Sequence, residues 1–133
     1  MLKNFIKAIF KKEPDSMVVN IERDESRLTV RLALNDRMCA DMQCVVESDT
    51  TILIGDIRHR SEADYGKGYG SQMMSAFLNY VAEHSFKYVH GNLATVDLDH
   101  KDRLHHFYQK FGFVITEYPE PQNTDYGKIE MRL

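Results

Sequence analysis

Residues 65–70 read Tyr-Gly-Lys-Gly-Tyr-Gly, and an unbroken helical pattern follows them from Ser71 onward. Glycine at every second position allows positive φ angles and leaves room for a ligand against the main chain. The first amides of the following helix lack a partner within the helix, and the helix dipole favours an anion at that end. A diphosphate group suits such a loop, and a plain turn is the alternative interpretation. The residues around the glycines must therefore decide between the two.

The residues before the glycines form four strand-like stretches, 17–22, 28–34, 41–47 and 51–58, and the first two alternate between apolar and polar. This period is typical of half-buried strands. Short polar turns join the stretches, with no helical pattern between them. The chain before residue 60 is therefore predicted to form an antiparallel meander.

Two helical patterns follow the glycines, separated by a strand at 88–96. The first carries an apolar stripe from Met74 to Val81, and the second carries one from Leu104 to Phe111. Asp99 is the expected N-cap of the second helix, and Gly112 is expected to end it.

Two last strands are predicted at 113–118 and 128–133, joined by a loop that holds Pro119 and Pro121. The element order predicts an α+β fold with a mixed, mostly antiparallel sheet of about six or seven strands flanked by helices. No linker composition interrupts the chain after its first segment, so 15–133 is expected to form a single domain.

Residues 1–14 are predicted to form a basic amphipathic helix. They carry a net charge of +3, which leaves −6 for the remainder of the chain. Apolar side chains fall on one helical face, opposite the lysines: Leu2, Phe5, Ile6, Ile9 and Phe10. Packing onto the domain's own sheet is favoured over contact with a membrane surface or a partner, because so short a helix anchors weakly.

The overall composition excludes several classes of protein. The chain has 133 residues and a net charge of −3, which gives no indication of nucleic-acid binding. No secretory signal and no segment long enough to span a bilayer is recognisable. The two cysteines, Cys39 and Cys44, lie at an odd separation in a strand and are interpreted as reduced thiols. A cytoplasmic protein is expected.

The glycine loop does not fit the two common nucleotide-binding loops. A P-loop needs four residues between its first glycine and a Gly-Lys-Ser/Thr ending, which is missing here. A dinucleotide-binding loop follows the first strand of a parallel βαβ unit, whereas this loop follows an antiparallel meander. The diphosphate must belong to another ligand.

The order of elements and two motifs resemble the GNAT superfamily of acetyl-CoA-dependent N-acetyltransferases. Residues 65–70 match the family's acyl-CoA loop, which is Arg or Gln, two residues, Gly, one residue, then Gly or Ala, except that Tyr65 stands first. Residues 107–113, Phe-Tyr-Gln-Lys-Phe-Gly-Phe, resemble the family's aromatic, Tyr, Glu, Lys, apolar, Gly, Phe signature. The resemblance covers 17–133 and implies acetyl transfer from acetyl-CoA to a primary amine of a small molecule, peptide or protein.

The resemblance also implies where acetyl-CoA, as co-substrate, would bind. Its diphosphate would lie on main-chain amides of the loop, while its pantetheine arm would pair with the edge of the fourth strand. Lys67 adds a positive charge for the phosphates or is simply a solvated loop lysine. The implied cofactor-binding residues are Ile57, Arg58, His59, Arg60, Tyr65, Gly66, Lys67, Gly68, Tyr69, Gly70 and Ser71.

Tyr108 matches the family's tyrosine that donates a proton to the departing thiolate, although a core tyrosine would fit the same apolar stripe. Asp56 and His59 are alternative general bases for the amine, and a water chain or no base at all remains open. His90 and Asn92 are further candidates to line the site. The adjacent pair His105-His106 faces two directions of a helix, so no metal site is expected.

One departure from the family concerns the acceptor. Family members place one or two helices between the first two strands, whereas here only a turn after Glu22 is available. An open acceptor site would suit a bulky acceptor, and the acidic balance of the domain would favour a cationic one. The alternative is a GNAT-fold module that binds acyl-CoA or a partner without catalysis. A homodimer through the final strands also stays open.

Overall fold

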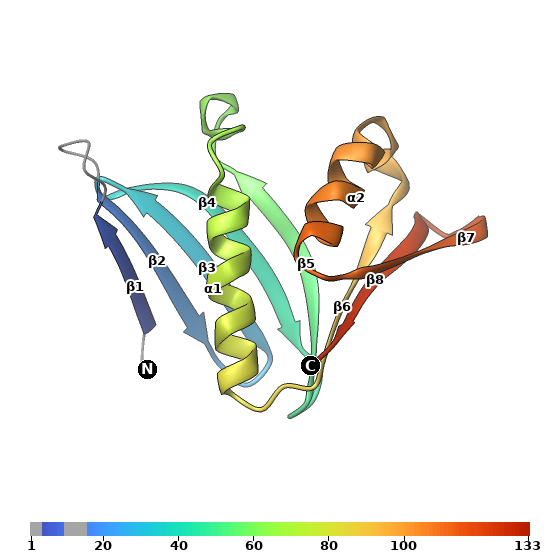
Figure 1. Ribbon diagram of the computed structural model, residues 1–133, viewed down its shortest axis with the longest axis horizontal. Helices are drawn as coiled ribbons and strands as arrows, with labels where there is room; N and C mark the ends of the chain where they lie inside the picture. The colour runs from blue at the N-terminus through green and yellow to red at the C-terminus, as the bar shows by residue number, and fades with distance from the viewer. Residues whose placement is uncertain (1–3, 10–15) are drawn as a thin grey trace.

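The computed structural model describes residues 4–9 and 16–133, which share one twisted eight-stranded sheet (Figure 1). The strand order across the sheet is β1-β2-β3-β4-β5-β6-β8-β7. The strands are β1 (Asn4–Ile9), β2 (Ser16–Arg23), β3 (Arg27–Leu34), β4 (Arg37–Val46), β5 (Thr51–His59), β6 (Tyr88–Ala94), β7 (Val114–Gln122) and β8 (Asp125–Arg132). The helices are α1 (Tyr69–Glu83) and α2 (Lys101–Lys110), with 3-10 turns η1 (Glu62–Asp64) and η2 (Thr95–His100).

The predicted antiparallel meander is present from β2 to β5. Its turns are built from the polar residues that the sequence places there. Asp24 Oδ1 accepts hydrogen bonds of 2.9 Å from the amides of Ser26 and Arg27, which closes the β2–β3 turn. Asn35 and Asp36 adopt φ angles of 51° and 66°, as a two-residue hairpin turn requires.

The strands β5 and β6 form the single parallel pair of the sheet, and they pair over only part of their length. Thr51–Ile54 pairs with Tyr88–Gly91, and beyond these residues the two strands separate. Gly55 forms a bulge at this point, since Ile54 lies opposite Cys44 and Asp56 lies opposite Gln43. We call the wedge between residues 55–59 of β5 and 92–94 of β6 the β5–β6 opening, which is visible in Figure 1.

Both helices cover the same face of the sheet. One buried cluster runs from Met17 on β2 to Ile129 on β8 and includes Phe77 of α1 and Tyr108 of α2. In Figure 1 the helix α1 lies in front of the central strands, and α1 contacts β2, β3 and β4. The alternation of the strands turns their apolar side chains toward this cluster.

The opposite face of the meander is polar. Cross-strand ion pairs lie on it, Arg31 with Glu22 at 2.9 Å and Arg58 with Asp41 at 3.0 Å. Neither α1 nor α2 packs there, and β2 continues into β3 through the turn at residues 24–26. Within the described ranges the expected departure from the family is therefore present: no helix follows β2 to cover this face.

The prediction of an N-terminal helix is wrong for Asn4–Ile9, which is strand β1. This strand pairs antiparallel with β2, with Ile6 opposite Val19. An isolated helix of this length is marginal in water, whereas the free edge of β2 offers a row of backbone partners. The rest of the predicted helix, 1–3 and 10–14, lies outside the described residues.

Two boundaries also differ from expectation. Pro119 and Pro121 lie within β7 rather than in a loop, which an edge strand with irregular pairing tolerates because proline has no amide hydrogen to donate. Asp99 lies inside η2 and does not cap α2, because the 3-10 turn runs directly into the helix and the amide of Lys101 bonds to the carbonyl of Leu98. In the part of the chain that the structure describes, no helix is long and apolar enough to cross a membrane.

Candidate active site

The glycine loop has the conformation that its composition predicts. Gly66 and Gly68 adopt φ angles of 74° and 79°, and no heavy atom lies within 4 Å of where a side chain would begin at either residue. Gly70 serves a different purpose, because the Phe107 ring lies 3.4 Å from the Cβ position there. Two of the three glycines therefore shape an open loop, and the third lets α2 approach α1.

The first turn of α1 presents main-chain donors to this open loop. The first bond within the helix joins the amide of Gln72 to the carbonyl of Gly68, so the amides of Tyr69, Gly70 and Ser71 precede it. No side chain caps this end of the helix. Such an end binds anions through amide hydrogen bonds and the helix dipole.

Two cations flank this helix end. Lys110 of α2 donates a hydrogen bond of 2.8 Å from Nζ to Ser71 Oγ, and its ammonium also lies 5.1 Å from the centre of the Phe111 ring. Lys67 is exposed within the loop itself. The sequence indicated Lys67 as a positive charge for the phosphates, but it did not indicate Lys110. Lys110 lies far from the loop along the chain and comes beside it only in the folded structure.

An ion pair between the buried Asp64 and the exposed Arg37 anchors the loop to the sheet. Asp64 is only 1% exposed and accepts hydrogen bonds from Arg37 Nη2 at 2.7 Å and Ser61 Oγ at 3.1 Å. The hydrogen bonds from Arg37 lower the pKa of Asp64 below its usual range. Burial raises the pKa of the neighbouring Tyr69, so its phenol stays neutral. This anchor was not identified from the sequence.

Tyr65 and His59 form a stacked pair beside the loop, with ring centroids 4.3 Å apart. Tyr65 is 56% exposed, so the residue at the family's Arg or Gln position offers an aromatic face in place of a charge. Partial burial lowers the pKa of His59, against the opposing charge of Asp64. His59 is therefore a neutral imidazole at neutral pH.

The end of β5 presents its side chains to two faces. Ile57 and His59 lie opposite Met42 and Ala40 of the core, so they belong to the face that the helices cover. Asp56 and Arg58 lie on the polar face.

Arg58 is held there by Asp41, through two hydrogen bonds of 3.0 Å, and lies 3.9 Å from Asp56. A shallow hollow of about 220 Å³ is lined by Asp41, Arg58, His59 and Arg60. The sequence-predicted residues of β5 are thus divided between two sides of the strand.

Tyr108 combines a buried ring with a hydroxyl that no described residue binds. It is 8% exposed and makes edge contacts with Phe107 and Phe113. Burial raises the pKa of Tyr108, and the negative charges of Asp97 and Asp56 raise it further. The tyrosine is therefore part of the core and also a protonated phenol near the β5–β6 opening.

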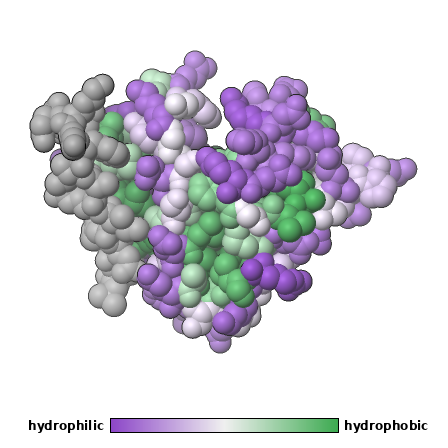
Figure 2. Space-filling model, viewed as in Figure 1, coloured by the Kyte–Doolittle hydropathy of each residue, from purple (hydrophilic) through white to green (hydrophobic). Residues whose placement is uncertain are grey.

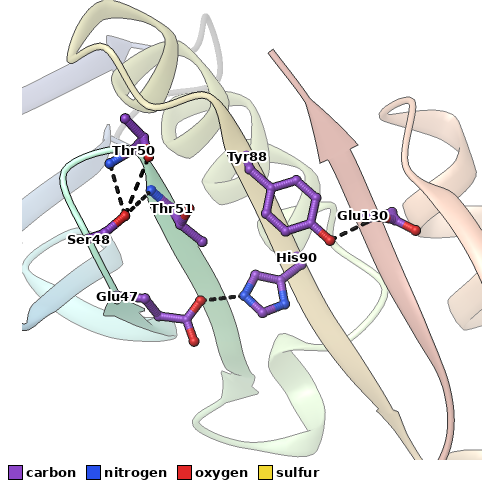
Figure 3. Close-up of polar contacts among 7 residues, drawn as sticks. All are labelled: Glu47, Ser48, Thr50, Thr51, Tyr88, His90 and Glu130. Carbon is purple, nitrogen blue, oxygen red and sulfur yellow. Dashed lines mark hydrogen bonds and ion pairs between the residues drawn. The ribbon is translucent and has the colours of Figure 1, made fainter.

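His90 and Asn92 occupy different positions relative to the β5–β6 opening. His90 lies opposite Leu53, in the paired part of the two strands, and bonds to Glu47 (Figure 3). Asn92 follows the last paired residue and is exposed at the start of the opening. Only Asn92 is placed to line the site.

Figure 3 shows how His90 is held. Its ring stacks on Tyr88, and the Tyr88 hydroxyl donates a hydrogen bond of 2.8 Å to Glu130. These contacts connect the β4–β5 turn to β6 and β8. They therefore stabilise the part of the sheet in which β5 and β6 are paired.

His105 and His106 have different surroundings. His105 Nε2 lies 2.9 Å from the Tyr126 hydroxyl, and His106 is exposed. Within the described ranges no group of three His, Cys, Asp or Glu side chains is placed to hold a metal ion. Cys39 and Cys44 are both buried free thiols.

The acetyltransferase (GNAT) family model matches residues 6–113. The chain belongs to the GNAT acetyltransferase family. No curated protein matches it by sequence.

Several solved structures share the fold. A GNAT acetyltransferase from Elizabethkingia anophelis with acetyl-CoA bound has a TM-score of 0.66 at 21% identity, covering 81% of this chain and 77% of that one. Ard1 from Thermoplasma volcanium has a TM-score of 0.64 at 23% identity, covering 82% and 71%. Arabidopsis thaliana Naa50, in complex with a bisubstrate analogue of CoA and a peptide, has a TM-score of 0.62 at 20% identity, covering 79% and 72%.

Proposed function

We propose that the protein transfers an acetyl group from acetyl-CoA to a primary amine by direct attack within a ternary complex. The observation that carries this proposal is the β5–β6 opening, which has the glycine loop at one side and the unpartnered hydroxyl of Tyr108 nearby. In this proposal the loop would hold the diphosphate and Tyr108 would supply the proton, on either side of the gap between the two strands.

The described residues fit acetyl-CoA. The amides of Tyr69, Gly70 and Ser71 and the charge of Lys110 would hold the diphosphate. Beyond Ile54, β5 is paired with β4 on one side and leaves its other edge open toward β6, so a pantetheine arm can pair with it as an added strand. Figure 2 shows apolar surface between the two helices and an indentation between the loop and α2.

Tyr108 is proposed as the proton donor. Acetyl-CoA supplies a thioester, and its sulfur leaves as a thiolate that needs a proton when the amine attacks. Because the pKa of Tyr108 is raised, the phenol carries its proton at neutral pH. Its ring is fixed by contacts with Phe107 and Phe113, which hold the hydroxyl in one place.

Asp56 is proposed as the general base, directly or through water. Its side chain is 64% exposed at the β5–β6 opening, on the polar face where an acceptor can approach. His59 lies on the other face and stacks on Tyr65, so it is better placed beside the co-substrate. The neutral amine is the nucleophile, and a carboxylate at this position removes the proton of the ammonium form.

The second candidate function is an acyl-CoA-binding module without transfer. The observation that favours it is the polar face of the meander, which neither α1 nor α2 covers. An acceptor on this face would lack a protein wall, which weakens its positioning for attack.

Two measurements separate these functions. Isothermal titration with acetyl-CoA and with desulfo-CoA tests binding, and thiol release with polyamines, amino acids, aminoglycosides and peptides tests transfer. We expect binding of both ligands, and turnover that falls about 100-fold in Tyr108→Phe with binding retained. CoA binding without turnover of any amine would support the module, and no heat at millimolar ligand would refute both functions.

A further inference from the structure

The hollow at the end of β5 lies on the polar face of the sheet. It measures about 220 Å³ and is lined by Asp41, Arg58, His59 and Arg60. The amide of Arg60 bonds to the carbonyl of Cys39, so the pairing of β5 with β4 continues past His59. Asp56, Arg58 and Arg60 therefore alternate onto one face, the same face on which an acceptor can approach Asp56.

Arg60 supplies the hollow with a positive charge that the neighbouring side chains do not compensate. Arg58 donates two hydrogen bonds of 3.0 Å to Asp41, so these two charges offset each other. Burial lowers the pKa of His59, so its imidazole is neutral at neutral pH. The side chain of Arg60 is exposed and has no hydrogen bond, ion pair or ring contact with any described residue. The hollow is therefore locally cationic, although the domain is acidic.

A carboxylate suits an arginine in this position. A guanidinium binds a carboxylate through two parallel hydrogen bonds. A volume of about 220 Å³ leaves room for several groups the size of a water molecule, each about 30 Å³, so a carboxylate and a few methylenes fit. The phosphates of CoA are the other anions to consider. The amides that suit them begin α1, which packs on the opposite face of the sheet.

The position of Asp56, the proposed general base, sets how far the amine would lie from this carboxylate. Asp56 and Arg60 are four positions apart on a stretch that pairs regularly with β4, which is about 13 Å at the usual rise of a strand. A hydrogen bond of about 2.9 Å at each end leaves about 7 Å for the ligand. An extended chain advances about 1.2 Å per bond, so about six bonds span this gap. An α-amino acid is too short to reach both side chains.

We propose that Arg60 binds a carboxylate of the acceptor in this hollow, and that the acceptor is an aliphatic amine with its carboxylate about six bonds from the nitrogen. This inference rests on the proposed function. The amine lies at Asp56, and the carboxylate stays bound and unchanged while the acetyl group is transferred. Arg60 is thus a residue that determines specificity.

The test compares matched acceptors and matched variants of the full chain. The acceptors are 6-aminohexanoate and 6-amino-1-hexanol, which have the same length and differ in the carboxylate. The variants are Arg60→Gln and Arg103→Gln, which each remove one exposed positive charge. Arg103 lies in the first turn of α2, outside the hollow. Melting temperatures verify that both variants fold.

We expect the ratio of kcat/KM for the amino acid to that for the amino alcohol to fall about tenfold in Arg60→Gln, as for loss of a hydrogen bond to a charged group. Arg103→Gln should keep the wild-type ratio. The ratio cancels any effect that a variant has on acetyl-CoA. The same ratio in Arg60→Gln and wild type, or equal losses in the two variants, would overturn the inference.

Chain length tests the spacing. The shorter 4-aminobutanoate should be a poorer acceptor than 6-aminohexanoate in the wild type, and this difference should shrink in Arg60→Gln. The amino alcohols of the same two lengths control for the chain itself. Equal kcat/KM for the two amino acids in the wild type would contradict a ligand that reaches from Asp56 to Arg60.

A binding measurement separates this inference from the proposed function. The probe 6-aminohexanoate is titrated into the protein saturated with CoA, where no transfer can occur. About tenfold weaker binding by Arg60→Gln but not by Arg103→Gln supports the carboxylate site, even if no amine is acetylated. No binding by the wild type at millimolar concentration refutes it, even if other amines are acetylated.

Titration of CoA alone tests the other anion. Arg60→Gln should lose less affinity for CoA than for 6-aminohexanoate. An equal or larger loss for CoA would assign Arg60 to the phosphates of the co-substrate and overturn the inference.

Discussion

Lys110 Nζ lies 2.8 Å from Ser71 Oγ and so joins the last turn of α2 to the first turn of α1. The bond places a positive charge beside the amides that would hold a diphosphate. The motif run at 107–113 and the start of the helix after the glycine loop are therefore in contact, although 39 positions separate the two bonded residues.

Replacing Lys110 with Met should weaken acetyl-CoA binding about tenfold at low salt, because a charge-assisted contact to phosphate is lost. The apolar stem of Met keeps the contact with Phe107 and Phe111. Isothermal titration at two salt concentrations measures the effect, which should shrink at high salt. Lys87→Met, at an exposed lysine before β6, is the matched control, and an equal loss there would contradict the role of Lys110.

Replacing Gly68 with Ala should destabilise the protein by about 1 kcal/mol, because a φ of 79° is unfavourable for a residue with a side chain. Asn tolerates this region better, so Gly68→Asn should lose less. Chemical denaturation gives the free energy of unfolding for the three proteins. The reverse order of stability for Ala and Asn would show that strain at this φ is not the cause.

The Asp64–Arg37 pair should contribute to stability in a defined range of pH. The pKa of Asp64 is lowered in the folded state, chiefly by the hydrogen bonds from Arg37. Its contribution is therefore complete above the unfolded pKa of about 3.9 and is lost as the pH falls through the lower folded value.

The Asp64→Asn variant should be less stable at pH 7 and should lose less stability than the wild type below about pH 4. Unfolding by urea between pH 3 and pH 7 measures both effects. Asp49→Asn, at an exposed turn residue, should follow the wild-type curve. Parallel curves for Asp64→Asn and wild type would exclude Asp64 as a source of the acid sensitivity.

Asp56 and His59 should differ in their effect on turnover. Asp56→Asn should lower kcat by about 100-fold or more, the usual loss of a general base. His59→Ala should lower kcat by less than about threefold and act instead on the Michaelis constant for acetyl-CoA, because its ring supports Tyr65 beside the loop. Steady-state kinetics of both variants with one accepted amine measures these two effects. A large loss of kcat in His59→Ala, with little loss in Asp56→Asn, would assign the general base to His59.

Local patterns predicted much of this fold. The alternation over 17–58 gave the meander, and the glycine spacing gave the positive φ angles at Gly66 and Gly68. The N-terminal segment failed because a free strand edge outweighs the preference of a short amphipathic sequence for a helix.

The site was harder to predict than the fold, because its residues meet only in three dimensions. Lys110 and the Asp64–Arg37 pair carry no local signal in the sequence, since charged residues are common in turns and helix ends. Tyr108 was found through a motif, and its ring contacts confirm that it belongs to the core, while its role as proton donor stays a prediction.

The bulge at Gly55 also changes which residues of β5 face the core. Before it, the even-numbered residues Ile52 and Ile54 face the core, whereas after it the odd-numbered residues Ile57 and His59 do. If β5 paired regularly with β4 through Gly55, without the bulge, the two sides would exchange, turning Asp56 inward and Ile57 outward. The bulge is therefore as important to this strand as its side chains, because it decides which of them lie on each side of the sheet.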